Sequence, residues 1–339
     1  MEAYSSESAS PSDLLPCTSD EGPTWFTVDV RFVIATVMLF SAVVATVICF
    51  GHEVFDPLAD SLLIQGWVAV IARTSLLWFT VGMLLIVIRT LLWVGYRPFA
   101  AASVTQAPRL SIVIPAYNEG AMVRKVVDAC ARAESPRDRL EIIVVNDGST
   151  DDTEVHVDQA HRDRPGLVQA VHLSVNAGKR KELAAGFAPA TGEIIVTVDS
   201  KSLIERGALL AIAGPFRDPR VGVVAGKVTV LNRFQSILPR MLHVRFVLSF
   251  DFLRNVQSSY GTVSCCPGAL SAYRAAVITP LIPTWLRQRV LGSECTIGED
   301  RALTNDGLAS GYKAVYQRTA VVHTIAPENY PQLCKMFLR

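Results

Sequence analysis

The chain has 339 residues, 50% of them hydrophobic, and its mean hydropathy of +0.32 is too high for an ordinary soluble enzyme, which indicates membrane segments. The formal net charge is only +1, so total charge gives no argument for binding nucleic acid. The seven cysteines include no C-x-x-C pair and the six histidines show no metal-ligand spacing, which favours reduced thiols in a cytosolic domain over a disulfide framework or a zinc site.

The N-terminal part of the chain predicts a tail and a first membrane helix. Residues 1–30 are rich in Ser, Pro and acidic residues, lack the basic region of a signal peptide and are expected to be disordered. Phe32–Phe50 carries no charge over 19 residues, about the length that crosses a bilayer. A buried core helix is the alternative for this segment.

A second apolar segment runs from about Thr74 to Val94, with Arg89 near its end. The loop 51–65 contains acidic residues but no Lys or Arg, whereas basic residues follow from Arg97 onward. By the positive-inside rule, the N-terminus and the region after the second segment should both be cytosolic. We therefore expect a multi-pass protein of the plasma or inner membrane, with two membrane helices in 31–96, a linker at 97–108 and a cytosolic domain at 109–339.

Three short apolar runs in that domain end in polar residues. Leu110–Ile114, Ile142–Val145 and Glu193–Val198 read as buried parallel strands because they are rich in β-branched residues and too short for helices. Helices are expected at Met122–Ala133 and Lys181–Ala188, so the pattern predicts an α/β domain.

The polar strand ends should meet at one edge of the sheet, where ligands bind in open α/β folds. The first strand runs into Tyr117 and Glu119, the second into Asp147, and the third into Asp199 and Lys201. Taken alone, the Asn-Asp-Gly sequence after the second strand is more often a plain turn than a site.

Apolar residues keep helical spacing over Phe234–Val256, with Arg240, His243 and Arg254 between them. Two interpretations stay open, a buried helix and an amphipathic helix that lies on the membrane surface.

Two further motifs follow toward the C-terminus. The small-residue stretch Ser264–Arg274 should lead into a helix. Glu299 and Asp300 stand at the start of another, where adjacent acids can cap the helix or, beside Asp147 and Asp199, supply a general base.

These motifs together resemble the processive family-2 glycosyltransferases, which include hyaluronan synthases, chitin synthases and the nodulation chito-oligosaccharide synthases. The resemblance covers about Arg109–Arg339, and the two predicted membrane helices also fit it. Its motifs, in the family's order, are SIVIPAYNE, VVNDGSTD, NAGKRK, the VDS strand end, CCPGALSAYR and GEDRALTN. It implies a nucleotide-sugar-binding GT-A domain, Rossmann-like, with a mostly parallel sheet.

The resemblance also implies roles for individual residues. Asp300 matches the catalytic base, and Asp199 the first acid of a D-x-D motif that handles ribose, phosphate and a Mg²⁺ or Mn²⁺ ion. The residues implied at the donor are Tyr117, Glu119, Asp147, Lys179, Asp199 and Lys201. Those implied at the acceptor are Cys266, Gly268, Arg274, Cys295, Glu299 and Arg301.

The chain departs from the family pattern twice. Lys201 stands where D-x-D has its second acid, so the lysine either turns into solvent, contacts the diphosphate or marks an inactive site. The sequence ends at Arg339, in the segment where the family has Q-x-x-R-W, and we expect a synthase shortened at its C-terminus.

The expected activity is inverting transfer from a UDP-sugar to a growing β-linked polysaccharide or oligosaccharide at a membrane, with no nucleic-acid partner. UDP-N-acetylglucosamine is the first candidate donor and UDP-glucuronate the second. The alternatives are a non-processive transferase that acts on a lipid acceptor and a degenerate protein that binds nucleotide sugars without turnover.

Overall fold

A computed structural model describes residues 66–290, 292–295 and 297–337, together with Met38, Ser41, Ala42 and Ala45. The predicted tail at 1–30, the loop 51–65 and the predicted membrane segment Phe32–Phe50, apart from those four positions, lie outside the described residues. The chain divides into two compact units, Met1–Ile88 and Arg89–Arg339.

The second predicted apolar segment is helical. Helix α2 spans Gly66–Gly95, and its part Trp78–Gly95 is long and apolar enough to cross a membrane by length and composition. It is the one helix of that kind in the part of the chain that the structure describes. The pair of membrane helices expected from the sequence is therefore not shown.

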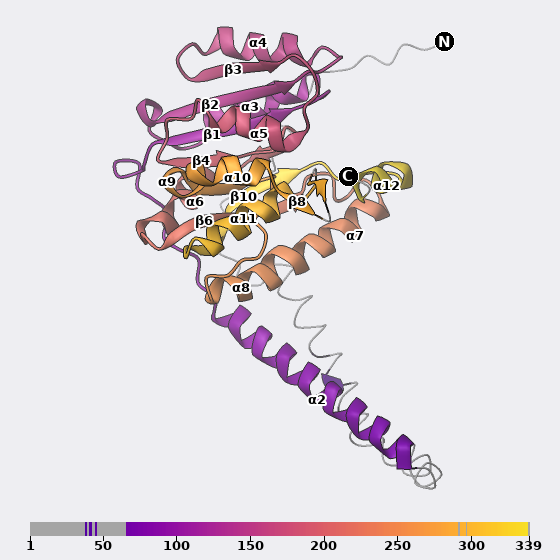
Figure 1. The fold of residues 1–339 in the computed structure, drawn as a ribbon. Helices are drawn as coiled ribbons and strands as arrows, with labels where there is room; N and C mark the ends of the chain where they lie inside the picture. The colour runs from indigo at the N-terminus through magenta and orange to yellow at the C-terminus, as the bar shows by residue number, and fades with distance from the viewer. Residues whose placement is uncertain are drawn as a thin grey trace. The chain divides into compact units, whose positions relative to one another are not determined.

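The unit Arg89–Arg339 is an α/β domain (Figure 1). Its strands are β1 Leu110–Ala116, β2 Leu140–Asp147, β3 Val168–Leu173, β4 Ile194–Thr197, β5 Ser202–Ile204, β6 Val221–Val230, β7 Ser271–Arg274, β8 Arg289–Val290, β9 Ser293–Glu294 and β10 Lys313–Thr324. Its α-helices are α3 Met122–Arg132, α4 Thr153–Asp163, α5 Lys179–Phe187, α6 Ala208–Ala213, α7 Ile237–Phe246, α8 Asn255–Ser259, α9 Ala275–Ile278, α10 Ile282–Leu286, α11 Glu299–Ala309 and α12 Tyr330–Phe337. Short 3₁₀ turns lie at η1 Arg137–Arg139, η2 Gly214–Arg217 and η4 Thr279–Leu281, and η3 Val247–Arg254 is a π-helix.

Among the described residues, the main sheet has eight strands in the order β3-β2-β1-β4-β7-β6-β10-β5. Strands β3, β2, β1 and β4 are parallel, as the sequence predicted. The other half is mixed, because β7 runs antiparallel to both β4 and β6, and β5 runs antiparallel to β10. The expectation of a mostly parallel sheet is thus corrected to a mixed sheet.

Strand β7 was not predicted from the sequence. The stretch Ser264–Arg274 leads into a helix as expected, since α9 begins at Ala275, but its last four residues, Ser271–Arg274, form a strand. The residues Ala272 and Tyr273 are fully buried in the sheet. Their backbone groups pair with β4 and β6 at the same time, a long-range arrangement that small residues do not signal locally.

The parallel half is held together by apolar packing. The Ile142–Val145 run of β2 is completely buried. Helix α3 buries Val123, Val126, Val127 and Cys130, which recur at the i, i+3, i+4, i+7 spacing of one helix face. Burying each such side chain stabilises the fold by about 1.5–3 kcal/mol, so these contacts fix the carboxyl ends of β1, β2 and β4 in space.

The predicted linker at 97–108 is anchored to the domain. The side chain of Gln317 on β10 accepts a hydrogen bond from the Phe99 amide at 3.0 Å and donates one to the Phe99 carbonyl at 2.8 Å. Ala107 in the same segment is fully buried. These contacts hold the chain between α2 and β1 against the sheet.

The segment predicted at Phe234–Val256 forms the consecutive helical elements α7, η3 and α8. One side is buried, with Leu242, Val247 and Phe250 packed inward. The other side exposes Ile237 and Met241 at 76% and 64%. The segment is therefore amphipathic rather than buried on all sides.

Candidate active site

The loop after β2 is built around Asp147. Its carboxylate is buried and accepts hydrogen bonds from the backbone amides of Ala177 and Gly178 at 2.7 and 2.9 Å. Gly148 has φ +62°, and a Cβ there would lie 2.6 Å from the Val175 backbone carbon, so only glycine fits. The Asn-Asp-Gly sequence thus makes both a tight turn and an anchor for the loop that leads into α5.

The loop after β1 is joined to the same region. The Thr153 hydroxyl accepts hydrogen bonds from the amides of Glu119 and Gly120, both at 2.8 Å. Asn118 has φ +53°, which is uncommon for a residue other than glycine, and its side chain accepts a hydrogen bond from the Thr150 amide at 2.9 Å. Tyr117 lies half-buried in this loop. Asn118 belongs to the polar end of the first strand that the sequence predicts, whereas Thr153 carries no comparable local signal.

Lys179, the first residue of α5, connects three elements. Its ammonium lies 3.0 Å from Asp199 Oδ1 in the loop after β4 and 3.4 Å from Glu299 Oε1 at the start of α11. Loss of hydration favours the neutral amine, but the charges of Asp199, Asp300 and Glu299 outweigh it and hold the pKa of Lys179 well above its ordinary value. This lysine is therefore a fixed cation among three carboxylates.

Asp300, in the first turn of α11, faces the loop before β7. Its Oδ2 accepts a hydrogen bond from the Gly268 amide at 2.7 Å. Loss of hydration raises the pKa of Asp300 to about 6, and the negative charges of Asp199 and Glu299 act in the same direction, against the opposing effect of Lys179. A carboxylate with a pKa near neutrality can accept a proton during a reaction and release it afterwards.

Gly268 marks how closely this cluster is packed. A Cβ at that position would lie 2.7 Å from Lys179 Nζ and 2.8 Å from Asp300 Oδ2. Thr304 fixes the same loop from one turn along α11, since its hydroxyl accepts a hydrogen bond from the Cys266 amide at 3.1 Å and donates one to the Asp300 carbonyl at 2.7 Å. The ammonium and the carboxylate thus face a single point on the loop backbone.

Lys201 forms an ion pair rather than pointing freely into solvent. Its ammonium lies 3.1 Å from Glu119 Oε2, with 54% of the lysine side chain and 11% of the glutamate side chain exposed. Because Glu119 follows β1 and Lys201 follows β4, the pair joins the ends of two neighbouring parallel strands.

Glu182, one turn into α5, is an acid that was not predicted as a site residue from the sequence. It is 4% exposed, and its Oε1 has no hydrogen-bond partner among the described residues. Burial raises the pKa of Glu182 to about 8, and the charge of Asp147 acts in the same direction. Its burial comes from tertiary packing, so nothing in the local sequence indicated it.

A cavity of about 240 Å³ opens beside this cluster. Asp199, Gly268 and Asp300 form its polar side, while Phe246 and Phe250 contribute to an apolar side. The remaining lining residues are Val228, Leu242, Pro267, Ala269, Thr324, Ile325, Ala326 and Pro327. A ligand here would meet both carboxylates and aromatic rings.

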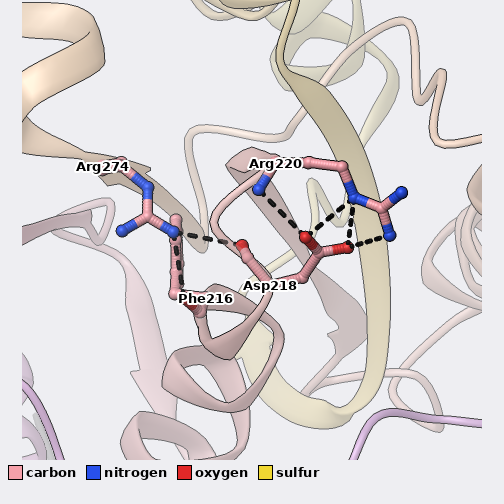
Figure 2. A network of polar contacts seen from close by, with 4 residues as sticks. All are labelled: Phe216, Asp218, Arg220 and Arg274. Carbon is pink, nitrogen blue, oxygen red and sulfur yellow. Dashed lines mark hydrogen bonds and ion pairs between the residues drawn. The ribbon is translucent and has the colours of Figure 1, made fainter.

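Not every predicted site residue contributes a side chain to this cluster. Arg274, at the end of β7, donates hydrogen bonds to the carbonyls of Phe216 (2.9 Å), Asp218 (3.2 Å) and Val221 (3.1 Å). Figure 2 shows its guanidinium directed at the loop 216–218, where Asp218 also binds Arg220. These contacts give Arg274 a structural position.

The other predicted acceptor residues differ in their surroundings. Cys266 is fully buried, and burial raises the pKa of its thiol to about 12. Cys295 is a half-buried free thiol next to β9, and Arg301 is exposed on α11. The structure therefore brings together Glu119 with Lys201, and Lys179 with Asp199, Gly268, Glu299 and Asp300.

Comparison with known proteins identifies similar chains. The model of the family described as "Glycosyl transferase family 2" matches residues 111–280. The chain is 32% identical over 234 residues to an N-acetylglucosaminyltransferase of Azorhizobium caulinodans, covering 68% of this chain and 58% of that protein. It is 29% identical over 235 residues to one of Rhizobium meliloti, covering 68% and 54%. The chain thus spans little more than half the length of these curated relatives.

Solved structures resemble the fold. A mannosyltransferase from Pyrobaculum calidifontis, in complex with GDP-Man and Mn²⁺, superposes with a TM-score of 0.57 at 24% identity, covering 72% of this chain and 64% of that one. GalNAc-T7 with UDP, GalNAc and Mn²⁺ gives a TM-score of 0.50 at 15% identity, covering 65% and 44%. At these identities the likeness shows a GT-A-like α/β fold.

Proposed function

The chain belongs to glycosyl transferase family 2, whose model matches residues 111–280, and on that premise we propose that it transfers a hexose from a UDP-sugar to an acceptor hydroxyl. N-acetylglucosamine is the proposed sugar because the two relatives named above are N-acetylglucosaminyltransferases. UDP-glucuronate is the second candidate donor. The main observation behind the proposal is that the Asp300 carboxylate and the Lys179 ammonium both lie close to Gly268, beside a cavity.

The proposed reaction is a direct displacement in which Asp300 is the general base. The acceptor oxygen forms a bond to the anomeric carbon, the bond from that carbon to the diphosphate oxygen breaks, and the acceptor proton passes to Asp300. The sugar configuration is therefore inverted. A pKa near 6 leaves Asp300 ionised at neutral pH, and a well-placed general base contributes about 10²–10⁴-fold in rate.

The departing UDP gains negative charge as the bond to the sugar breaks. Lys179 is the proposed partner of that charge, because its ammonium already lies beside Asp199 and close to Gly268. Asp147, Tyr117 and Glu119 are the proposed nucleoside side of the site, since they occupy the loops after β1 and β2. Glu299 is proposed to hold Lys179 in place through the 3.4 Å ion pair.

A divalent cation is the expected cofactor of this fold, and the two solved structures named above contain Mn²⁺. The carboxylates of this chain do not fit such an ion as they are arranged. Asp199 is paired with Lys179, and Glu119 is paired with Lys201, so a cation would have to displace an ammonium from either acid. We therefore derive no step of the reaction through a metal ion.

For the acceptor we propose a growing β-linked polysaccharide or oligosaccharide at a membrane, of the chitin or hyaluronan synthase type. The apolar helix Trp78–Gly95 and the exposed apolar side of α7 support attachment to a membrane. A lipid-linked acceptor is the second candidate, because Leu242, Phe246 and Phe250 line one side of the cavity that Asp300 enters. Membrane association is proposed for both.

The proposal is tested with purified protein, UDP-N-acetylglucosamine and a chitin oligosaccharide, and with UDP-glucuronate as a competing donor. We expect UDP release and a β-linked product, and both should be lost in Asp300→Asn. Partition of the labelled product between water and organic solvent then distinguishes a sugar acceptor from a lipid acceptor. UDP release no faster than that of the Asp300→Asn protein would contradict the proposal.

A further inference from the structure

We propose that Lys201 provides, as a fixed ammonium, positive charge at the donor diphosphate, so that this chain binds a nucleoside diphosphate without requiring a divalent cation. The inference rests on the proposed function, because it assumes that the diphosphate of a UDP-sugar occupies the edge of the sheet at β1 and β4. The position of Lys201 in the fold supports this role.

The location of Lys201 is the first argument. Strands β1, β2 and β3 succeed one another toward one edge of the sheet, and β4 then returns to the other side of β1. The order of strands therefore reverses between β1 and β4, and ligands of open α/β sheets bind at the carboxyl ends of the strands at this kind of reversal. The ion pair of Lys201 with Glu119 spans that point, since the two residues follow β4 and β1.

The pairing of the neighbouring acids is the second argument. Glu119 has Lys201 at 3.1 Å, and Asp199 has Lys179 at 3.0 Å. The acid that follows each of these two strands thus already has an ammonium beside it. Mg²⁺ and Mn²⁺ bind through carboxylate oxygens. A metal ion at this edge must therefore compete with the lysine ammonium that each acid already contacts.

The exposure of the two partners is the third argument. The Glu119 side chain is 11% exposed, whereas that of Lys201 is 54% exposed. The acid is therefore the more buried partner, and the lysine side chain remains accessible to a second anion. An ammonium has three donors on a flexible stem, so Lys201 can contact Glu119 and a phosphate oxygen together.

The charge balance agrees with this role. A lysine in place of an acid raises the local charge by two units, which is the charge of one divalent ion. Lys201 and Lys179 approach the same region from the loop after β4 and from the start of α5.

The test measures UDP affinity by calorimetry with the full chain in detergent, in the presence of either Mn²⁺ or EDTA. The unmodified protein should bind UDP with affinities that agree within about threefold in the two buffers. Lys201→Asp should bind at least about tenfold more weakly in EDTA and recover when Mn²⁺ is added. Lys125→Asp, which reverses the charge of an exposed lysine on α3, is the matched control and should behave as the unmodified chain.

The Lys201→Gln variant distinguishes a role of the Lys201 charge in UDP binding from a purely structural role of its ion pair with Glu119. Loss of the ammonium should weaken UDP binding in EDTA, and Mn²⁺ should not restore it as it does in Lys201→Asp. A structural bridge alone would lower the melting temperature of Lys201→Gln and leave its UDP affinity unchanged, which would overturn the inference.

Two further outcomes distinguish this inference from the function on which it rests. UDP binding by the unmodified protein that falls at least about tenfold in EDTA overturns the role of Lys201 and leaves the proposed function standing. The absence of UDP binding in both buffers overturns the proposed function, and the inference with it.

Discussion

Two clusters of charged residues in this domain show opposite electrostatics. In the cluster of Lys179, Asp199, Glu299 and Asp300, loss of hydration and neighbouring acids raise the pKa of Asp300 to about 6. In the loop shown in Figure 2, the hydrogen bonds from Arg220 lower the pKa of Asp218 to about 2. The pKa of the same residue type shifts in opposite directions because Asp300 loses hydration by burial beside two other acids, whereas Asp218 accepts hydrogen bonds from Arg220.

The cluster around Asp300 is a candidate active site, whereas the cluster around Asp218 supports the fold. Asp218 has both carboxylate oxygens bound by its own neighbour, and its backbone carbonyl is bound by Arg274, so it has no need of a ligand. In the other cluster Asp300 is buried beside Asp199 and Glu299, which disfavours its ionised form. An ionisable group with a strongly shifted pKa at the edge of a sheet is typical of catalytic sites.

Replacing the base should produce the largest effect. We expect Asp300→Asn to lower kcat by about 10²–10⁴-fold while UDP affinity stays within a few-fold, because a general base acts in the transition state. The asparagine oxygen can still accept the hydrogen bond from Gly268. Steady-state kinetics and UDP titration provide the measurement, and Asp218→Asn in the second cluster is the control that should retain full turnover. Retained turnover in Asp300→Asn would remove this residue from the role of base.

Filling the space at Gly268 should have the next largest effect. A methyl group there must displace Lys179 or Asp300, and small misplacements of catalytic groups cost up to about 100-fold in rate. We expect Gly268→Ala to lower kcat/KM by about 10–100-fold with little change in melting temperature. Gly207→Ala is the control, because a Cβ at that position meets no atom within 4 Å. Equal activity of the two variants would show that the cluster tolerates the methyl group.

The supporting cluster should affect stability instead of catalysis. Arg274→Ala removes charge-assisted hydrogen bonds to three carbonyls, and we expect a loss of about 2 kcal/mol in the free energy of unfolding. Denaturant titration measures this loss, while KM for the acceptor should remain unchanged. Arg274→Lys keeps the charge and should recover part of the stability. A raised KM without loss of stability would instead indicate that Arg274 contacts a substrate, as the family resemblance implies.

The smallest expected effects are changes of activity and stability with pH, and these should differ between the two clusters. Below about pH 6, kcat/KM should fall about tenfold per unit as Asp300 becomes protonated. The stability effects have opposite signs in the two clusters. The pKa of Asp300 is raised, so its contribution to stability is complete below about pH 4 and is lost as pH rises through about 6. The pKa of Asp218 is lowered, so its contribution is present above about pH 4 and is lost as pH falls toward 2.

Melting temperatures of Asp300→Asn and Asp218→Asn between pH 2 and pH 8 test these signs. Relative to the unmodified protein, Asp300→Asn should gain stability as pH rises through about 6. Asp218→Asn should lose a small amount of stability above pH 4 and none near pH 2. Curves that run parallel for both variants would contradict the opposite electrostatics of the two clusters.

The sequence by itself determined where the chemically important positions lie along the chain. Buried runs such as Ile142–Val145 can be recognised because their apolar pattern is local, and the polar residues that follow them, Glu119, Asp147 and Asp199, fall at one edge of the sheet by the geometry of parallel strands. The start of α11 at Glu299 follows from helix-initiating acids in the same local way.

Only the tertiary structure decided which of these charges meet. The pairing of Lys201 with Glu119 joins residues from different strand ends, and the burial of Glu182 depends on the packing of α5 against β1 and β2. The insertion of β7 between β4 and β6 likewise follows from contacts far apart in the chain. Coulomb energies depend on distance and on the loss of hydration, and both quantities are fixed by packing between segments rather than by the order of residues within them.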